Sequence, residues 1–391
     1  MQKHSSTMMQ RSTLLLLVVL IQGACNPANS QKAEEVEHPP VSVQQPSDQE
    51  EIAASRQTAI TRAVSAATPA VVSINVIAVE QVAVRDPFMN DPFFEQFFGR
   101  RRARMYQRQV KALGSGFVIS PDGYIATNNH VVRNATAITV SLHTGETMQA
   151  ELVGRDEATD IALLKVDAGH PLDYLRFASS QEPLVGEWAI ALGNPFGLFE
   201  ATEPTVTVGV VSAVGRDFEI QERAVYRDMI QTDAAINQGN SGGPLVNADA
   251  EVMGLNTFIF TQSGGSIGLG FAVPARKVER IIAELKENGF VDRSYYTGLT
   301  GYDINEGIAK ALGLESTAGL IVQDVGDGSP AETAGFQPYD VITSLGGEDV
   351  ENLSGFQARL YDFRPGDTVE FGVIRDGKPL TLTMVIGRTE G

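Results

Sequence analysis

The sequence predicts a mainly β protein in which two β-barrels are followed by a small α+β module. Many short β-branched runs, separated by Gly, Asp, Asn and Pro, begin at about residue 58. One clear helical pattern follows them, and a second, shorter set of strand-like runs comes after it. Short strands at this spacing, without helices between them, are typical of sandwiches and barrels. The length of 391 residues favours two barrels and a further module.

The individual elements can be placed from these runs. Those of the first region are AVVSINVIAV, GSGFVIS, YIATNNHVV, AITVSLH, IALLKV, EWAIALG, TVTVGVVSAV, PLVNADAEVMGLNTFIF and GLGFAVP. Asp122 and Gly123 join two of them in a hairpin signal. The helical pattern covers residues 274–288, with proline at its start and Gly289 as its stop. The last module contains the strand-like runs GLIVQDV, DVITSLGG, DTVEFGVIRDG and LTLTMVIG and the helical patches NEGIAKALG and LSGFQARLYDF.

The N-terminal region predicts export from the cytoplasm. A weakly basic start precedes an apolar segment at residues 13–21, which is too short to span a bilayer and is typical of a secretory signal over residues 1–25. Cys25 occupies the place of the lipidated cysteine in bacterial lipoprotein signals, although Gln22 stands where such signals usually carry leucine. Residues 26–57 are polar and rich in proline and glutamine, which predicts a disordered tether.

Composition excludes several classes of function. An apolar content of 43% and a charged content of 20% are those of an ordinary globular protein. The net charge of -18 argues against nucleic acid as a partner, because a phosphate backbone requires a basic surface. The sequence contains neither a cluster of metal-ligand residues nor a nucleotide-binding loop, so we expect no metal and no cofactor. A single cysteine allows no intramolecular disulfide.

Ser241 stands in an unusual local sequence, DAAINQGNSGGPLVN at residues 233–247. Glycine loses much backbone entropy on folding, so the glycines around this serine are expected to serve a special geometry. Two interpretations fit the stretch by itself. It forms a turn between two strands, or it presents an exposed nucleophile surrounded by backbone N–H groups that face a substrate.

A serine nucleophile needs a base and a third group that orients the base. Of the five histidines, two lie in the signal and the tether, and His143 and His170 lie in polar, turn-like contexts. His130, in ATNNHVV, closes a hairpin strand and is followed by two valines; a structural histidine is the alternative. Asp160 directly precedes the apolar run IALLKV, where a carboxylate needs a partner, and a plain strand edge is the alternative.

The order of these residues distinguishes two catalytic folds. GNSGG also matches G-x-S-x-G, the nucleophile elbow of α/β-hydrolases. Those enzymes place the histidine after the serine, but no histidine follows residue 170, and the βαβ alternation is missing. The order His130, Asp160, Ser241 is instead that of chymotrypsin-like proteases, whose first barrel carries His and Asp and whose second carries Ser.

These motifs resemble the HtrA (Deg) family of envelope serine proteases. The likeness rests on GSGFVIS with YIATNNHVV, on TDIALLKV, on QTDAAINQGNSGGPLVN and on a C-terminal module that begins YTGL, and it extends over about residues 60–388. The resemblance implies a trypsin-like protease domain at 58–276, a helical linker at 277–292 and one PDZ domain at 293–388.

The resemblance also assigns roles in catalysis. Ser241 would be the nucleophile, His130 the general base and acid, and Asp160 the group that orients the histidine. The backbone N–H groups of Gly239 and Ser241, with Asn240 between them, would form the oxyanion hole.

Two departures from the digestive trypsins bear on specificity and activation. Ala235 stands where those enzymes carry an aspartate, and Ile236 and Ile259 resemble the apolar S1 lining of the family, so small aliphatic P1 residues are expected. Asn240 replaces the aspartate that pairs with a newly cut N-terminus in zymogen-type relatives, so activation must come from elsewhere.

The C-terminal module is a candidate for that control. PDZ domains capture a peptide by strand addition and hold its carboxylate in a nest of backbone N–H groups. By resemblance, Thr297, Gly298 and Leu299 would supply these donors, and Arg216 would be a sensor that relays peptide binding. A simple β-turn is the alternative for the 297–299 stretch.

The resemblance thus implies an ATP-independent endopeptidase that cleaves unfolded or damaged proteins and responds to C-terminal peptides. It further implies a homotrimer or higher oligomer in the periplasm or cell envelope, attached to the membrane if Cys25 is lipidated. The alternatives are a regulatory protease with one specific substrate, and a chaperone or adaptor whose proteolysis is secondary.

Overall fold

The computed structural model describes residues 56–84, 104–178, 180–194, 203–218, 225–237, 239–259 and 268–389. The predicted signal with Cys25 and nearly all of the predicted tether lie outside these residues, as does the side chain of Ile259. None of the described helices is long and apolar enough to cross a membrane.

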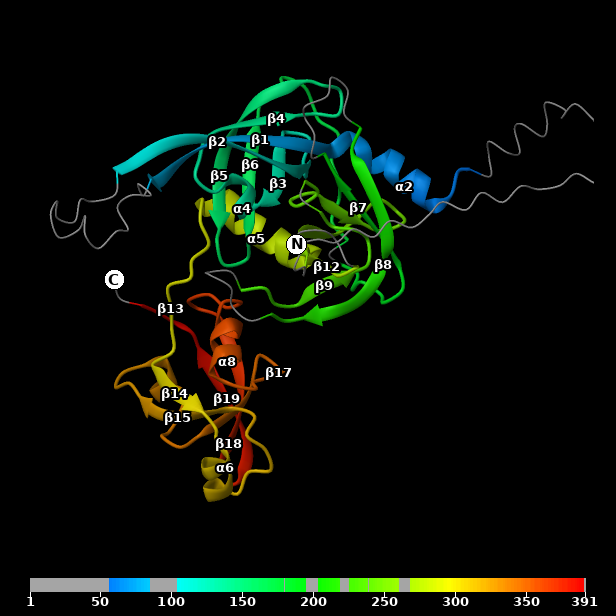
Figure 1. The fold of residues 1–391 in the computed structure, drawn as a ribbon. Coiled ribbons are helices and arrows are strands. Elements are labelled where there is room, and N and C mark those ends of the chain that lie inside the picture. The colour runs from blue at the N-terminus through cyan, green and yellow to red at the C-terminus, as the bar shows by residue number, and fades with distance from the viewer. Residues whose placement is uncertain are drawn as a thin grey trace, which may run out of the picture. The chain divides into compact units, whose positions relative to one another are not determined.

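The first six strands close into a barrel (Figure 1). Its strand order is β1-β2-β3-β6-β5-β4, with antiparallel pairing throughout. The hairpin predicted at Asp122 and Gly123 connects β2 to β3. The strands are β1 (Val71–Val84), β2 (Arg104–Val118), β3 (Tyr124–Asn128), β4 (Ala135–Ser141), β5 (Thr147–Asp156) and β6 (Ile161–Val166).

The next six strands close into a second barrel, in the order β10-β11-β12-β9-β8-β7. Together the two barrels confirm the predicted fold class. Branched and aromatic side chains fill the interiors, and Ile74, Phe117 and Leu192 have no exposed surface. The strands are β7 (Trp188–Gly193), β8 (Thr205–Arg216), β9 (Met229–Thr232), β10 (Pro244–Val246), β11 (Val252–Ile259) and β12 (Gly270–Pro274).

The barrel region differs from the sequence prediction in five elements. β5 and β9 were not predicted, since the first half of β5 is largely exposed and polar and β9 is only four residues long. Helix α2 (Ala59–Ala67), capped by the Thr58 side chain, and the 3-10 turn η1 (Thr68–Ala70) precede β1. His130 does not end a strand, because β3 stops at Asn128 and a short helix, α4 (Asn129–Val132), begins.

Helix α5 (Ala275–Asn288) follows the barrels at the predicted position. Gly289 ends it in the left-handed conformation, as expected for a helix stop. Val278, Ile281 and Leu285 belong to the same buried apolar cluster as the barrel interior. The helix is therefore packed on the barrels along its apolar face.

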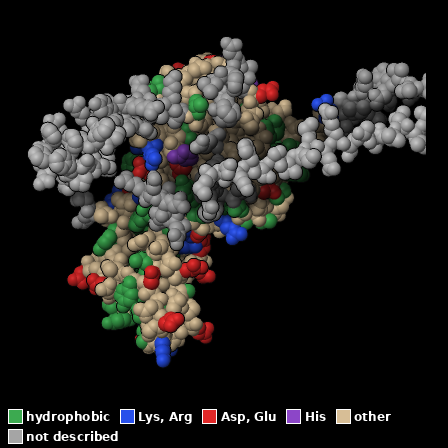
Figure 2. Space-filling view, in the orientation of Figure 1, with side chains coloured by type: hydrophobic (Ala, Val, Ile, Leu, Met, Phe, Trp, Pro, Cys, Tyr) green, Lys and Arg blue, Asp and Glu red, His purple; other side chains and the backbone are tan. Residues whose placement is uncertain are grey.

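The C-terminal module has a separate apolar core and a sheet in the order β14-β15-β16-β18-β19. Acidic side chains are spread over the face of this module drawn in Figure 2, in keeping with the acidic net charge. Its elements are β13 (Tyr295–Tyr296), β14 (Leu299–Asp303), α6 (Glu306–Leu312), β15 (Leu320–Val325), α7 (Pro330–Thr333), β16 (Val341–Leu345), β17 (Glu348–Asp349), α8 (Leu353–Leu360), β18 (Thr368–Arg375), β19 (Lys378–Val385) and β20 (Gly387–Arg388).

Candidate active site

His130 and Asp160 are joined by direct hydrogen bonds at one end of the first barrel. His130 Nδ1 lies 2.7 Å from Asp160 Oδ2, and the His130 backbone N–H donates to Asp160 Oδ1 at 2.9 Å. The carboxylate side chain is only 4% exposed, whereas the imidazole is 43% exposed. With Nδ1–H directed at the carboxylate, the other ring nitrogen, Nε2, is the one that can take a proton from a nucleophile.

The backbone of Asp160 is held in an uncommon conformation. Its φ is +58°, in the left-handed region that Asp enters at a cost of roughly 1 kcal/mol. The Asp160 carbonyl accepts from the Asn129 backbone N–H and from the Asn128 side chain, both at 3.0 Å. Asn128 also donates to Thr257 Oγ1 of the second barrel at 3.3 Å. The backbone of Asp160 is therefore held, directly or through Asn128, by residues of both barrels.

The turn before Asp160 is organised by a second buried carboxylate, that of Asp156. It accepts from the Thr159 hydroxyl at 2.6 Å and from the Thr159 backbone N–H at 3.2 Å, and it pairs with Arg293 after helix α5. Burial by itself would raise the pKa of Asp156, but the bonds and charge of Arg293, with the bonds from Thr159, hold that pKa below its ordinary value. The charged form of this pair supports the turn that carries Asp160.

The loop that carries Ser241 is packed between strands of both barrels. A Cβ on Gly242 would lie 2.2 Å from the Ser115 carbonyl oxygen and 2.5 Å from Thr127 Oγ1, so only glycine fits there. The Ser115 backbone N–H donates to the Ser241 carbonyl at 3.1 Å. Thr127 lies on β3, three residues before His130, so this packing brings the serine loop beside the strand that leads to the histidine.

No hydrogen bond joins Ser241 to His130, both of which the structure describes. Catalytic hydrogen bonds in unliganded proteases are often long and shorten when substrate binds. The structure thus brings His130 and Asp160 into direct contact and Ser241 into the adjoining loop.

The three residues of the predicted oxyanion hole differ in whether their backbone N–H groups are already hydrogen-bonded. The Asn240 backbone N–H donates to the Asn237 carbonyl at 3.2 Å and is used within the loop. Among the described residues, the N–H groups of Gly239 and Ser241 have no acceptor, so these two can face a substrate oxyanion. The Asn240 side chain bonds the Asn237 N–H and the Ala235 carbonyl, which fixes the loop internally.

The predicted S1 lining is only partly described. Ile236 is 1% exposed and belongs to an apolar cluster of the second barrel with Ala234 and Ala272. A Cβ on Gly270 would lie 2.6 Å from Ile236 Cγ1, so the isoleucine is closely packed. The assignment of Ile236 and Ile259 to the S1 pocket stays a prediction.

The predicted carboxylate loop of the C-terminal module precedes an edge strand, β14. The Thr297 and Gly298 carbonyls accept from the N–H groups of Ala331 and Gly326, at 3.0 and 2.9 Å. The Leu299 N–H donates to Thr297 Oγ1 at 3.2 Å, so this predicted donor is already engaged within the turn. The Gly298 N–H has no acceptor among the described residues.

The remaining predicted residues lie apart from this site. Arg216 is exposed at the end of β8, next to Met229 of β9. His143 Nδ1 lies 3.2 Å from the Pro69 carbonyl, and His170 pairs with Glu146 on the surface. His170 is exposed, as its polar context predicted, whereas His143 is half-buried.

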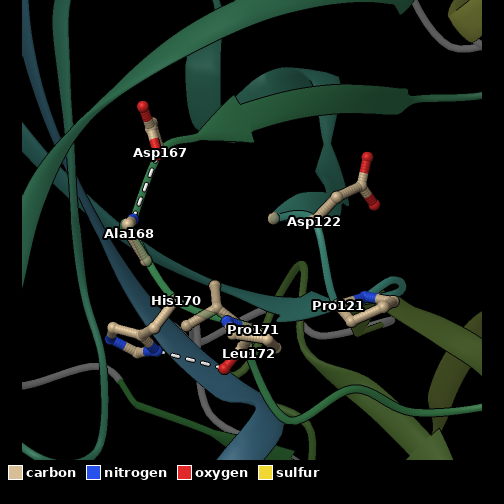
Figure 3. Close-up of a pocket in the computed structure, with 9 residues that line it drawn as sticks. Pro121, Asp122, Asp167, Ala168, His170, Pro171 and Leu172 are labelled. Carbon is tan, nitrogen blue, oxygen red and sulfur yellow. Dashed lines mark hydrogen bonds between the residues drawn. The ribbon is translucent and has the colours of Figure 1, made fainter.

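A surface pocket, drawn in Figure 3, lies at the end of the first barrel opposite to His130 and Asp160. Asp122 and Asp167 flank it. Asp122 lies just before β3 and Asp167 just after β6, at the ends of these strands that are farthest from His130 and Asp160. His170 also lines this pocket. Within the described ranges, no group of three or more His, Cys, Asp or Glu side chains could hold a metal ion.

Sequence reasoning missed Ser115, Asn128 and Thr257. Each is a buried polar residue bonded within or next to the segments that carry His130, Asp160 and Ser241. The sequence signal that could have identified them is a polar residue among apolar residues of one strand, as in GSGFVIS and YIATNN.

Comparison with known proteins agrees with this geometry. A trypsin-like peptidase domain matches residues 114–255, and a PDZ domain matches residues 290–386. A probable periplasmic serine endoprotease, DegP-like, of Chlamydia muridarum (strain MoPn / Nigg) is 44% identical over 301 residues, which are 75% of this chain and 59% of that protein. Its counterpart in Rhizobium meliloti (strain 1021) is 43% identical over 277 residues, 71% of this chain and 53% of that protein.

Solved structures match over nearly their whole length. The HtrA-type protease AlgW with decapeptide is 36% identical, with a TM-score of 0.62, and the match covers 85% of this chain and 99% of that one. The serine endoprotease from Yersinia pestis is 32% identical, with a TM-score of 0.55 and the same coverage. The chain spans less than two thirds of the length of the curated relatives named above.

Proposed function

Since the chain belongs to the HtrA (DegP-like) family of serine endoproteases, we propose that it hydrolyses peptide bonds in unfolded or damaged proteins without ATP. The observation that carries this proposal is the buried Asp160 carboxylate, 2.7 Å from His130 Nδ1, beside the glycine-rich loop of Ser241. A buried acid that fixes one tautomer of a half-exposed imidazole is the arrangement that a serine nucleophile needs.

The reaction would proceed through an acyl-enzyme. Ser241 Oγ attacks the carbonyl carbon of the substrate and passes its proton to His130 Nε2, while Asp160 stabilises the imidazolium. The N–H groups of Gly239 and Ser241 donate to the oxygen that becomes negatively charged. The imidazolium then protonates the leaving amine as the C–N bond breaks, and water hydrolyses the ester by the reverse sequence of proton transfers.

The preference for particular P1 residues would follow from the apolar residues near the nucleophile loop. Ala235 and the buried Ile236 precede Ser241, and neither offers a charge to a basic P1 side chain. We expect small aliphatic P1 residues to be cleaved best.

The PDZ domain would regulate this activity. β14 is an edge strand, so a peptide can add to its free side and direct its C-terminal carboxylate at the 297–299 turn. The solved AlgW structures contain a decapeptide or a tripeptide. Arg216, exposed at the end of β8, is the residue we assign to the relay.

The expected place of action is the periplasm or cell envelope. The curated relatives named above are described as probably periplasmic, and the N-terminal 25 residues have the pattern of an export signal. Lipidation of Cys25 would attach the enzyme to a membrane, and a homotrimer or higher oligomer is the expected assembly.

Digestion of casein tests the proposed function. The wild type should degrade casein, faster when C-terminal peptides are added, and Ser241→Ala should not. If both proteins only suppress aggregation of an unfolded client, the chain is a chaperone or adaptor instead. If neither degrades casein but one envelope protein is cut at a single site, the regulatory alternative replaces general degradation.

A further inference from the structure

Ser115 lies in the first barrel but contacts the nucleophile loop of the second. We propose that Ser115 is a positioning residue that holds the oxyanion-hole segment, residues 239–241, in its active conformation. The inference rests on the proposed protease function and adds to it a residue that touches neither substrate nor the reacting atoms.

Three hydrogen bonds connect Ser115 to the site. It lies on β2 with no exposed surface, and its backbone N–H donates to the Ser241 carbonyl at 3.1 Å. Its hydroxyl donates to the Gly239 carbonyl and accepts from the Asn194 N–H, the latter at 2.7 Å. A hydroxyl has one proton to donate and lone pairs to accept with, so both bonds form at once.

These bonds hold the loop on both sides of Asn240. The carbonyls of Gly239 and Ser241 are both bonded to Ser115, and the two proposed oxyanion donors are the N–H groups of the same two residues. Gly239 has a φ of +121°, a conformation that glycine adopts freely and also leaves freely. The bond from Ser115 to the Gly239 carbonyl favours one orientation of the peptide between Gly239 and Asn240, together with the bond from the Asn240 N–H to the Asn237 carbonyl.

Close packing supports the same arrangement. A Cβ on Gly193, at the end of β7, would lie 2.4 Å from Asn240 Cα and 3.0 Å from Ser115 Oγ. Gly193 is thus packed against both Asn240 and Ser115. The Asn194 N–H fixes the Ser115 hydroxyl from the β7 side. The hydroxyl has little room to turn away from Gly239.

The chain contains a matched control for this hydroxyl. Ser73 on β1 pairs directly opposite Ser115 and is equally buried, with no exposed surface. Its Oγ has no hydrogen-bond partner among the described residues. Two buried serines at one register position therefore differ in their side-chain bonds: the Ser115 hydroxyl bonds Gly239 and Asn194, and that of Ser73 bonds neither.

The test compares Ser115→Ala with Ser73→Ala in the full chain. We would measure kcat and KM on one peptide substrate, the rate of labelling of Ser241 by a fluorophosphonate, and the thermal midpoint. Ser115→Ala should lower kcat and the labelling rate about 100-fold, the usual loss when an oxyanion donor is removed. KM should change by less than about twofold, because bonds made only in the transition state affect kcat.

The pH profile separates positioning from structural damage. The midpoint of the acid limb should be the same in Ser115→Ala and the wild type, because the pair of His130 and Asp160 is untouched. Ser115→Cys, which keeps a weak donor, should recover part of kcat, and it replaces Ser115→Ala if the alanine variant does not fold. Ser73→Ala should retain the wild-type kcat.

Two results would overturn the inference. One is a kcat of Ser115→Ala equal to that of Ser73→Ala. The other is a loss in kcat that matches the loss of folded protein, with the surviving fraction labelled at the normal rate. If the wild type itself cleaves no peptide, the proposed function fails instead, and the two failures are thereby distinguished.

Discussion

The two ends of the first barrel carry the same residue types with different consequences. β3 and β6 run antiparallel, so His130 and Asp160 lie at one end, and Asp122, Asp167 and His170 lie at the other. At the first end the histidine is 2.7 Å from a carboxylate that is 4% exposed. At the second, His170 is 3.3 Å from Glu146, and these side chains are 52% and 43% exposed.

Burial and backbone restraint, rather than residue type, therefore distinguish the pair of His130 and Asp160 from the surface pair of His170 and Glu146. The backbone of Asp160 is held by Asn128, Asn129 and the turn organised by Asp156. Both oxygens of its carboxylate bond to His130, one to the backbone N–H and one to the ring. The bond between His170 and Glu146 joins two exposed side chains and is weakened by water and salt. Three predictions test this contrast.

The largest effect is expected for Asp160→Asn. The amide cannot hold the same imidazole tautomer, so kcat/KM on casein-derived peptides should fall by about 10⁴-fold, as when the aspartate of other triads is changed. His170→Ala and Asp122→Asn, at the other end of the barrel, are the controls and should retain full activity. An active Asp160→Asn enzyme would show that His130 works without its partner.

Arg293→Ala should have the next largest effect, on stability. It leaves the buried Asp156 without its partner, and the loss of one member of a buried pair costs about 3 kcal/mol or more. Because the folded pKa of Asp156 is lowered, this stabilisation is fully present above its ordinary pKa of 3.8 and is lost as pH falls through the lowered value.

Urea unfolding of wild type and Arg293→Ala, measured from pH 7 down to pH 2, checks this prediction. The difference in unfolding free energy should be largest at neutral pH and should shrink in acid. A difference that is independent of pH would mean that the arginine acts through packing alone.

The smallest effect concerns His170. Its bond to the Pro171 carbonyl and, after that, its bond to Glu146 raise the pKa of His170 above its ordinary value. Whatever stability this adds is present below the ordinary pKa and is lost as pH rises through the raised one. NMR titration should show the raised pKa, and Glu146→Gln should lower it while casein cleavage stays unchanged.

The fold and the chemical core of the site could be predicted because their signals are local. Alternating β-branched runs predict strands, and the order of His130, Asp160 and Ser241 along the chain distinguishes a double-barrel protease from an α/β-hydrolase. The exposed, polar β5 and the short β9 gave no such signal. Helix α4 was also missed, because β-branched valines follow His130 and imitate a strand.

The supporting contacts could not be predicted, because they join segments that are far apart in the chain. Ser115 and Gly239 are separated by 124 positions, and Asn128 and Thr257 by 129. Nothing in GSGFVIS or YIATNN says which distant carbonyl or hydroxyl its polar side chain will meet. Residue identity and spacing along the chain indicate the chemistry. The packing of the two barrels against each other determines the hydrogen-bond partners, because a buried polar group bonds to whatever the folded chain brings within reach.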